Sequence, residues 1–157
     1  MNQNFDPLLY ELGRDALFGL SVMALVLVFN GVCYTRVLFW YRKVASNVSS
    51  KNSLGTIVLF VMSVLALAIV QLCAILIWAL ALFHMDLIPT RAMAILFSGS
   101  CYTTIGVFED LLPAGWKSVA LFIAFSGLFS FAWATSIMMS MANSFTQAWD
   151  KSNKPRT

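Results

Sequence analysis

Residues 92–113 read AMAILFSGSCYTTIGVFEDLLP, an apolar segment that becomes rich in Ser, Thr and Gly and ends in two acids. Its apolar part, residues 92–108, has seventeen residues, fewer than the about 20 that a helix needs to cross a membrane. The last six of these residues, TTIGVF, are poor helix formers. We therefore predict a short helix that enters a membrane and returns as extended chain, which is tolerated at that depth only inside protein or beside water.

Three long uncharged stretches flank this segment, at residues 16–35, 54–83 and 118–145. Each is long enough to cross a bilayer as a helix, because a hydrocarbon core about 30 Å thick needs about 20 helical residues. Hydrophobic residues make up 60% of the chain and charged residues only 11%, against roughly a quarter charged in soluble domains. The sequence therefore predicts an all-α integral membrane protein with three transmembrane helices and one re-entrant helix.

The same composition argues against several functional classes. The net charge of +3 is small and scattered, so we expect no binding of nucleic acid. The three cysteines, Cys33, Cys73 and Cys101, lack the number and spacing of a disulfide scaffold or a zinc site. With one histidine and no recognised catalytic motif, the chain is expected to be no enzyme and to hold no cofactor.

The charged residues predict the orientation of the spans. Residues 36–53 carry four basic residues and no acid, and bases also outnumber acids in residues 146–157. Basic segments next to membrane spans face the cytoplasm, which places both segments there. Residues 1–15 and 84–117 carry more acids than bases, and they then lie outside. We expect a multi-pass protein of the cell membrane, with the N-terminus outside and the C-terminus cytoplasmic.

The order of elements around this segment resembles the pore module of the potassium-channel superfamily. The filter of that family reads T-T-V-G-Y-G-D, followed by two residues and a proline, and residues 103–106 (TTIG) match its first four positions. Residues 110–113 (DLLP) match the exit, and residues 97–98 (FS) match the aromatic–serine pair of its pore helix. The resemblance covers residues 54–145, and it leaves the first helix as an addition.

The resemblance implies a division of the chain and a set of site residues. Residues 1–53 would form an N-terminal transmembrane helix and cytoplasmic loop, residues 54–145 the pore module, and residues 146–157 a cytoplasmic tail. The implied ion filter consists of Thr103, Thr104, Ile105, Gly106, Val107 and Phe108, and the implied outer acidic mouth consists of Glu109 and Asp110. A monovalent or divalent cation would bind at Thr104, Glu109 and Asp110. Four copies of the chain would surround one axis, as a homotetramer in the lipid bilayer.

These residue types suit the chemistry of cation conduction. Threonine hydroxyls and successive backbone carbonyls replace the hydration shell of a cation when four copies converge on an axis. Glycine permits the backbone dihedral angles that direct consecutive carbonyls the same way. The C-terminal end of a pore helix is partly negative, and acidic residues at an outer mouth raise the local concentration of cations.

The sequence departs from the family pattern between Gly106 and Asp110, where three residues stand in place of two. Without a gap, Phe108 replaces the second glycine of the filter and Glu109 replaces its aspartate. With a one-residue insertion, Asp110 keeps its role and Glu109 is extra. Phenylalanine avoids the positive φ that glycine accepts, so in either alignment the outer half of a potassium filter does not form in the usual way.

The expected function is weakly selective, passive conduction of cations, with potassium, sodium and calcium as the candidate ions. The alternative is a non-conducting subunit with the channel fold that stabilises a larger complex with other membrane subunits. Gly127 recurs with other small residues in the last stretch, a pattern typical of close helix packing. It also lies where channels of this family often carry a gating glycine, which makes it a possible hinge.

The predicted orientation is tested by cysteine labelling in a background without the native cysteines. A cysteine introduced by Asn47→Cys should be shielded from a membrane-impermeant maleimide in intact cells, because the basic segment that contains it faces the cytoplasm. The same reagent should label Asp110→Cys from outside. Labelling of position 47 in intact cells would contradict the topology.

Overall fold

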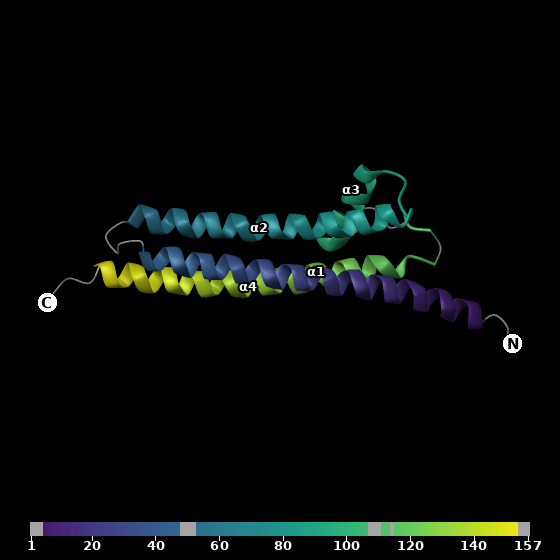
Figure 1. Cartoon of the computed structure of the whole chain (residues 1–157), viewed down its shortest axis with the longest axis horizontal. Coiled ribbons are helices and arrows are strands. Elements are labelled where there is room, and N and C mark those ends of the chain that lie inside the picture. The colour runs from purple at the N-terminus through teal and green to yellow at the C-terminus, as the bar shows by residue number, and fades with distance from the viewer. Residues whose placement is uncertain (1–4, 48–52, 107–110, 114, 154–157) are drawn as a thin grey trace. The chain divides into compact units, whose positions relative to one another are not determined.

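The computed structural model describes the backbone of residues 5–47, 53–106, 111–113 and 115–153, and within these the side chains of residues 13–46, 54–106, 111–113 and 115–146. Four helices account for most of the described chain: α1 (Phe5–Asn47), α2 (Ser53–His84), α3 (Arg91–Tyr102) and α4 (Ser118–Asn153) (Figure 1). The described residues contain no strand, which confirms the all-helical class.

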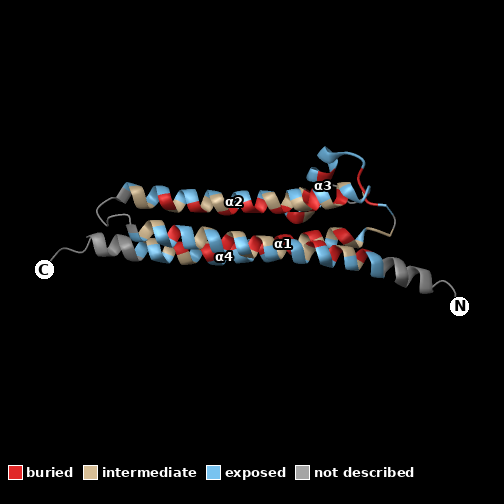
Figure 2. Cartoon of the chain, in the orientation of Figure 1, coloured by how far each residue is buried: buried red, intermediate tan, exposed pale blue. Residues whose placement is uncertain are grey.

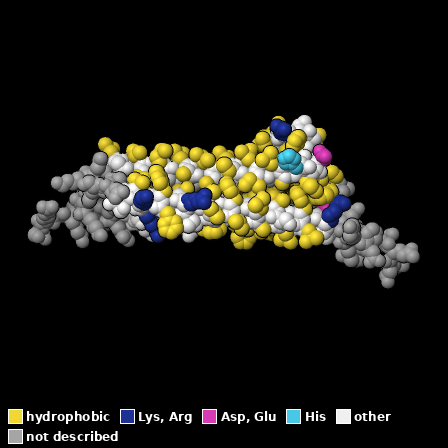
Figure 3. Space-filling model, viewed as in Figure 1, with side chains coloured by type: hydrophobic (Ala, Val, Ile, Leu, Met, Phe, Trp, Pro, Cys, Tyr) yellow, Lys and Arg dark blue, Asp and Glu magenta, His cyan; other side chains and the backbone are white. Residues whose placement is uncertain are grey.

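The three long helices are apolar enough to span a membrane. The candidate spans are Gly13–Ser46, Leu54–His84 and Ser118–Thr146, with mean hydropathies of 2.2, 2.8 and 1.7. Only 17%, 28% and 33% of these apolar segments is buried inside the chain, so most of their side chains face outward, as Figure 3 shows for one side. The prediction of three helices suited to a membrane is confirmed.

The first helix is longer than the uncharged stretch that predicted it. α1 continues through Arg36 and Arg42 to Asn47, because residues 36–47 contain no glycine or proline that would end a helix. Both arginine side chains are exposed. Most of the basic segment at residues 36–53 is therefore helical.

The described chain forms two compact units, and each long helix contributes to both. The first unit comprises Met1–Phe29 and Leu72–Ser130, and the second comprises Asn30–Gln71 and Phe131–Thr157. The functional division at residues 53 and 145 that was expected from the sequence stays a prediction. The compact units are assembled differently, each from parts of three helices.

The first unit has a core in which a tryptophan connects two helices. Trp78 of α2 is completely buried, and its indole N–H donates a hydrogen bond of 2.9 Å to Ser126 Oγ of α4. α1 packs on α4 where Gly19 lies against the ring of Phe122. Buried positions recur every three or four residues along α1 in this unit, which is the period of a helix face packed on its neighbours (Figure 2).

The second unit is held by aromatic side chains. The Tyr41 hydroxyl of α1 donates a hydrogen bond of 3.2 Å to the Met141 carbonyl of α4, and the tyrosine is buried. Nearer the middle of α1, the rings of Tyr34 and Trp133 meet edge to face, with their centroids 6.1 Å apart. α2 also contacts α4 in this unit, because the ring centroid of Phe60 lies 5.9 Å from that of Phe145 of α4.

The hydrogen bond between Trp78 and Ser126 predicts a measurable loss of stability when the acceptor is removed. Ser126→Ala leaves the indole N–H of Trp78 buried without an acceptor, and we expect the free energy of unfolding to fall by about 1 kcal/mol. Unfolding of the purified protein in SDS, followed by circular dichroism, measures the change.

Thr135→Ala is the matched control, because the Thr135 hydroxyl is exposed and bonds only to the Phe131 carbonyl of its own helix turn. It should leave the free energy of unfolding nearly unchanged. Equal effects of the two substitutions would contradict the assigned role of Ser126.

Candidate functional site

The candidate site begins with α3, whose start is defined by a capping residue. Thr90 precedes the helix in an extended conformation, and its hydroxyl oxygen accepts a hydrogen bond of 3.4 Å from the Met93 amide. Ala94, Phe97 and Ser98 then face the interior of the first unit, at the spacing of a helix face. The completely buried Ser98 hydroxyl has no hydrogen-bond partner among the described residues.

The segment that follows α3 turns so that its backbone amides form hydrogen bonds with the helix. The amides of residues 103–106 all donate to carbonyls of the last turn of α3, and the bonds are 2.8–3.4 Å long. Ile105 and Gly106 both donate to the Ser100 carbonyl, at 2.8 Å and 3.4 Å. The Thr103 hydroxyl adds a bond of 2.7 Å to the Gly99 carbonyl. The donors of this segment are therefore satisfied by the helix that precedes it.

The backbone carbonyls of this segment differ from its amides in their hydrogen bonding. Thr103 has a φ of −89°, whereas Thr104 has a φ of +60° and Gly106 a φ of +71°. Among the residues that the structure describes, no group donates a hydrogen bond to the carbonyls of Thr104, Ile105 or Gly106. The segment therefore combines satisfied donors with three acceptors that the described chain leaves open.

The C-terminal end of α3 lies far from the ends of the two helices on which it packs. A Cβ atom on Gly127 of α4 would overlap the Tyr102 carbonyl, and a Cβ on Gly99 would lie 3.8 Å from Ile75 of α2. Gly127 is nine residues from the start of α4, and Ile75 is nine residues before the end of α2. At 1.5 Å per residue, both contacts are about 13–14 Å along their helices, a little under half of a hydrocarbon core about 30 Å thick.

A groove of about 420 Å³ lies between the end of α3 and the first half of α4. The predicted filter residues Thr104 and Gly106 form part of one wall, and Lys117 is the charged residue among those that line it. The complete lining is Phe97, Cys101, Thr104, Gly106, Lys117, Ala120, Leu121 and Ala124. The groove is open to the surface of the single chain and is mainly apolar.

The structure describes four of the eight residues that the sequence predicted for the filter and the acidic mouth. Residues 103–106 are exposed, and Ile105 is 68% exposed despite its apolar side chain. Val107, Phe108, Glu109 and Asp110 lie outside the described residues. Among the described residues, no three His, Cys, Asp or Glu side chains gather as metal ligands. The proposed cation site at Thr104, Glu109 and Asp110 stays a prediction.

Two contacts of the site could not be identified from the sequence alone. One is the close approach of the Tyr102 carbonyl to Gly127, and the other is the hydrogen bond of Trp78 to Ser126, one residue earlier. The available signal was the run of small residues in α4, which predicts that another element packs closely. The structure gives Gly127 a packing role, and its role as a hinge stays a prediction.

Comparisons with protein-family models, with curated proteins and with solved structures found no match to this chain.

The contact at Gly127 predicts that this position does not accept alanine. Gly127→Ala places a methyl group against the Tyr102 carbonyl, and overpacking of this kind costs about 1–3 kcal/mol unless the end of α3 moves. We expect a lower free energy of unfolding in SDS, measured by circular dichroism.

Gly13→Ala is the matched control, because nothing lies within 4 Å of a Cβ atom at that helical position. It should be neutral or stabilising by up to about 1 kcal/mol, since alanine is the better helix former. If Gly127→Ala is as well tolerated as Gly13→Ala, the end of α3 does not pack closely against Gly127 of α4.

Proposed function

We propose that this chain is a subunit of a cation-conducting pore in which four copies bring residues 103–106 to a common axis. The observation that carries the proposal is the position of the end of α3 along α2 and α4, away from their ends, together with the open carbonyls of Thr104, Ile105 and Gly106. Carbonyls of this kind, converging from several copies, replace the hydration shell of a cation. In this proposal α3 is the re-entrant helix that was expected from the sequence.

The depth of residues 103–106 supports a re-entrant path. In a bilayer, non-helical backbone is stable only where protein buries it or where it lines a water-filled cavity. The contacts at Ile75 and Gly127 put the end of α3 about 13–14 Å along helices that are suited to span a membrane. The chain alone leaves Thr104 and Ile105 exposed there. Other copies on one side and water on the other would meet both conditions.

The C-terminal end of α3 itself favours cations. The last turn of this helix contains no basic residue, and the C-terminal end of a helix carries a partial negative charge. The amides of residues 103–106, which would attract anions, are already engaged by the carbonyls of α3. Open acceptors next to a negative helix end support the passage of positive ions.

The proposal places Glu109 and Asp110 at the outer mouth and the basic segment of α1 in the cytoplasm of the cell. In a tetramer the two acids contribute up to eight carboxylates to one ring, and like charges at this density hold cations or protons. Phe108 in place of a glycine supports weak discrimination between potassium and sodium. Calcium would bind at such a mouth and block or permeate the pore.

The conduction experiment uses the purified chain in liposomes with potassium, sodium and calcium in turn. We expect flux of both monovalent cations and an effect of calcium on that flux. Neutralising the mouth (Glu109→Gln with Asp110→Asn) should lower monovalent flux at low salt, where charges are least screened, and should weaken the calcium effect.

Asp86→Asn is the matched control for the neutralised mouth. Asp86 is an exposed acid of the turn between α2 and α3, and asparagine accepts its φ of +53°. This variant should conduct like the wild type. Absence of flux for every cation, or a single copy in the purified assembly, would favour the accessory-subunit alternative. Sharp selectivity for potassium would remove the role given to the acidic mouth.

A further inference from the structure

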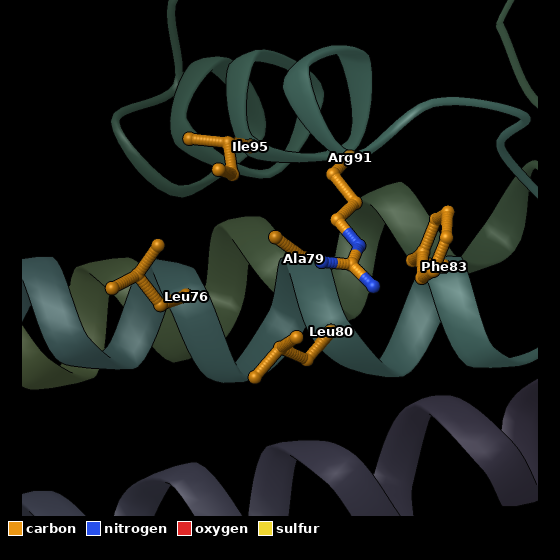
Figure 4. Close-up of a pocket in the computed structure, with 6 residues that line it drawn as sticks. All are labelled: Leu76, Ala79, Leu80, Phe83, Arg91 and Ile95. Carbon is orange, nitrogen blue, oxygen red and sulfur yellow. The ribbon is translucent and has the colours of Figure 1, made fainter.

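A second groove, between α2 and α3 of the first unit, has features that ion conduction does not use. Its volume is about 240 Å³, and it is lined by Leu76, Ala79, Leu80, Phe83, Arg91 and Ile95 (Figure 4). We call it the α2–α3 groove. Five of its six lining side chains are apolar, and Arg91 carries the charge among them.

The arginine of this groove has no anionic partner among the residues that the structure describes. Arg91 lies in the first turn of α3, and its guanidinium extends onto α2, 5.2 Å from the centre of the Phe83 ring (Figure 4). Asp86 is the nearest acid in the sequence, and in the described chain neither it nor another acid pairs with Arg91. Arg91 is exposed, and its guanidinium has five N–H donors that an anion can accept from.

The groove runs along α2, one of the helices long and apolar enough to span a membrane. It follows α2 from Phe83, next to the last residue of the helix, to Leu76, seven residues earlier. Seven residues correspond to about 10 Å along a helix. In a bilayer the end of a spanning helix lies near the headgroups, and a point about 10 Å further in lies among the acyl chains. The charged end of the groove thus lies at the level of lipid phosphates and its apolar end at the level of lipid tails.

We propose that the α2–α3 groove binds one anionic phospholipid, with its phosphate on Arg91 and part of one acyl chain along Leu76, Leu80 and Ile95. Arginine binds phosphate with two parallel charge-assisted hydrogen bonds. The volume of about 240 Å³ is smaller than the roughly 300–1,000 Å³ of clefts that enclose a whole ligand. The groove therefore holds part of a ligand whose remainder stays in the bilayer. This assignment requires insertion in a membrane and is independent of ion conduction.

The test is native mass spectrometry of the purified full-length chain in detergent. Phosphatidylglycerol and phosphatidylcholine with identical acyl chains are added in equal amounts. The wild type should retain phosphatidylglycerol in preference, because its headgroup has no ammonium to offset the phosphate. Arg91→Gln should lower the affinity for phosphatidylglycerol about tenfold, the usual effect of losing hydrogen bonds to a charged group.

Arg14→Gln is the matched control. Arg14 also lies over an aromatic ring in the first unit, 4.9 Å from the centre of Trp116, but it does not line the α2–α3 groove. It should leave lipid retention unchanged. Equal loss of phosphatidylglycerol in both variants would mean a general charge effect and would overturn the proposal.

A further variant tests the apolar half of the groove and keeps the charge. Ile95→Trp fills the groove with an indole, and it should also weaken retention of phosphatidylglycerol. Glycerol phosphate, which has the phosphate but no acyl chain, should fail to displace the bound lipid at equal concentration. Displacement would mean a site for free phosphate. That result, equal retention of both lipids by the wild type, or unchanged retention in Arg91→Gln or Ile95→Trp would overturn the lipid assignment.

Discussion

Four consecutive amides, those of residues 103–106, donate to the last carbonyls of α3, and the candidate site depends on this arrangement. An unpaired amide inside hydrocarbon costs several kcal/mol, so non-helical backbone needs internal acceptors to exist there. The last turn of α3 supplies those acceptors. The donors are consumed, and the carbonyls of residues 104–106 stay open among the described residues.

The end of α3 is positioned by neighbouring contacts from α2 and α4 in the first unit. Trp78 of α2 bonds to Ser126 of α4, and the next residue, Gly127, receives the Tyr102 carbonyl. Three helices therefore meet where a large residue, a small polar residue and a glycine occur together. The indole of Trp78 reaches from α2 to α4, and the missing side chain of Gly127 leaves the space for the Tyr102 carbonyl of α3.

The long helices of this chain were predictable because uncharged, hydrophobic stretches mark where they lie. The uncharged stretches at residues 54–83 and 118–145 correspond to α2 and to most of α4. The length of α1 was missed, because charged residues do not end a helix that glycine and proline leave unbroken. The short α3 was expected from its apolar half and its Thr- and Gly-containing end.

The contacts of the candidate site were much less predictable. The approach of Tyr102 to Gly127 and the placement of Arg91 on Phe83 join residues from different helices, and no local pattern specifies which positions meet. The sequence does show that α4 is rich in small residues, but it does not show which residue fills the space. The filter, the acidic mouth, the copy number and the selectivity stay predictions that rest on the resemblance of residues 103–113.

The positive φ of Thr104 has an energetic consequence for the segment that follows α3. A residue other than glycine in the left-handed region costs roughly 1–2 kcal/mol, and a β-branched side chain makes that region especially unfavourable. The bonds of Ile105 and Gly106 to the Ser100 carbonyl oppose the return of Thr104 to a relaxed backbone. The segment therefore stores conformational strain beside its open carbonyls.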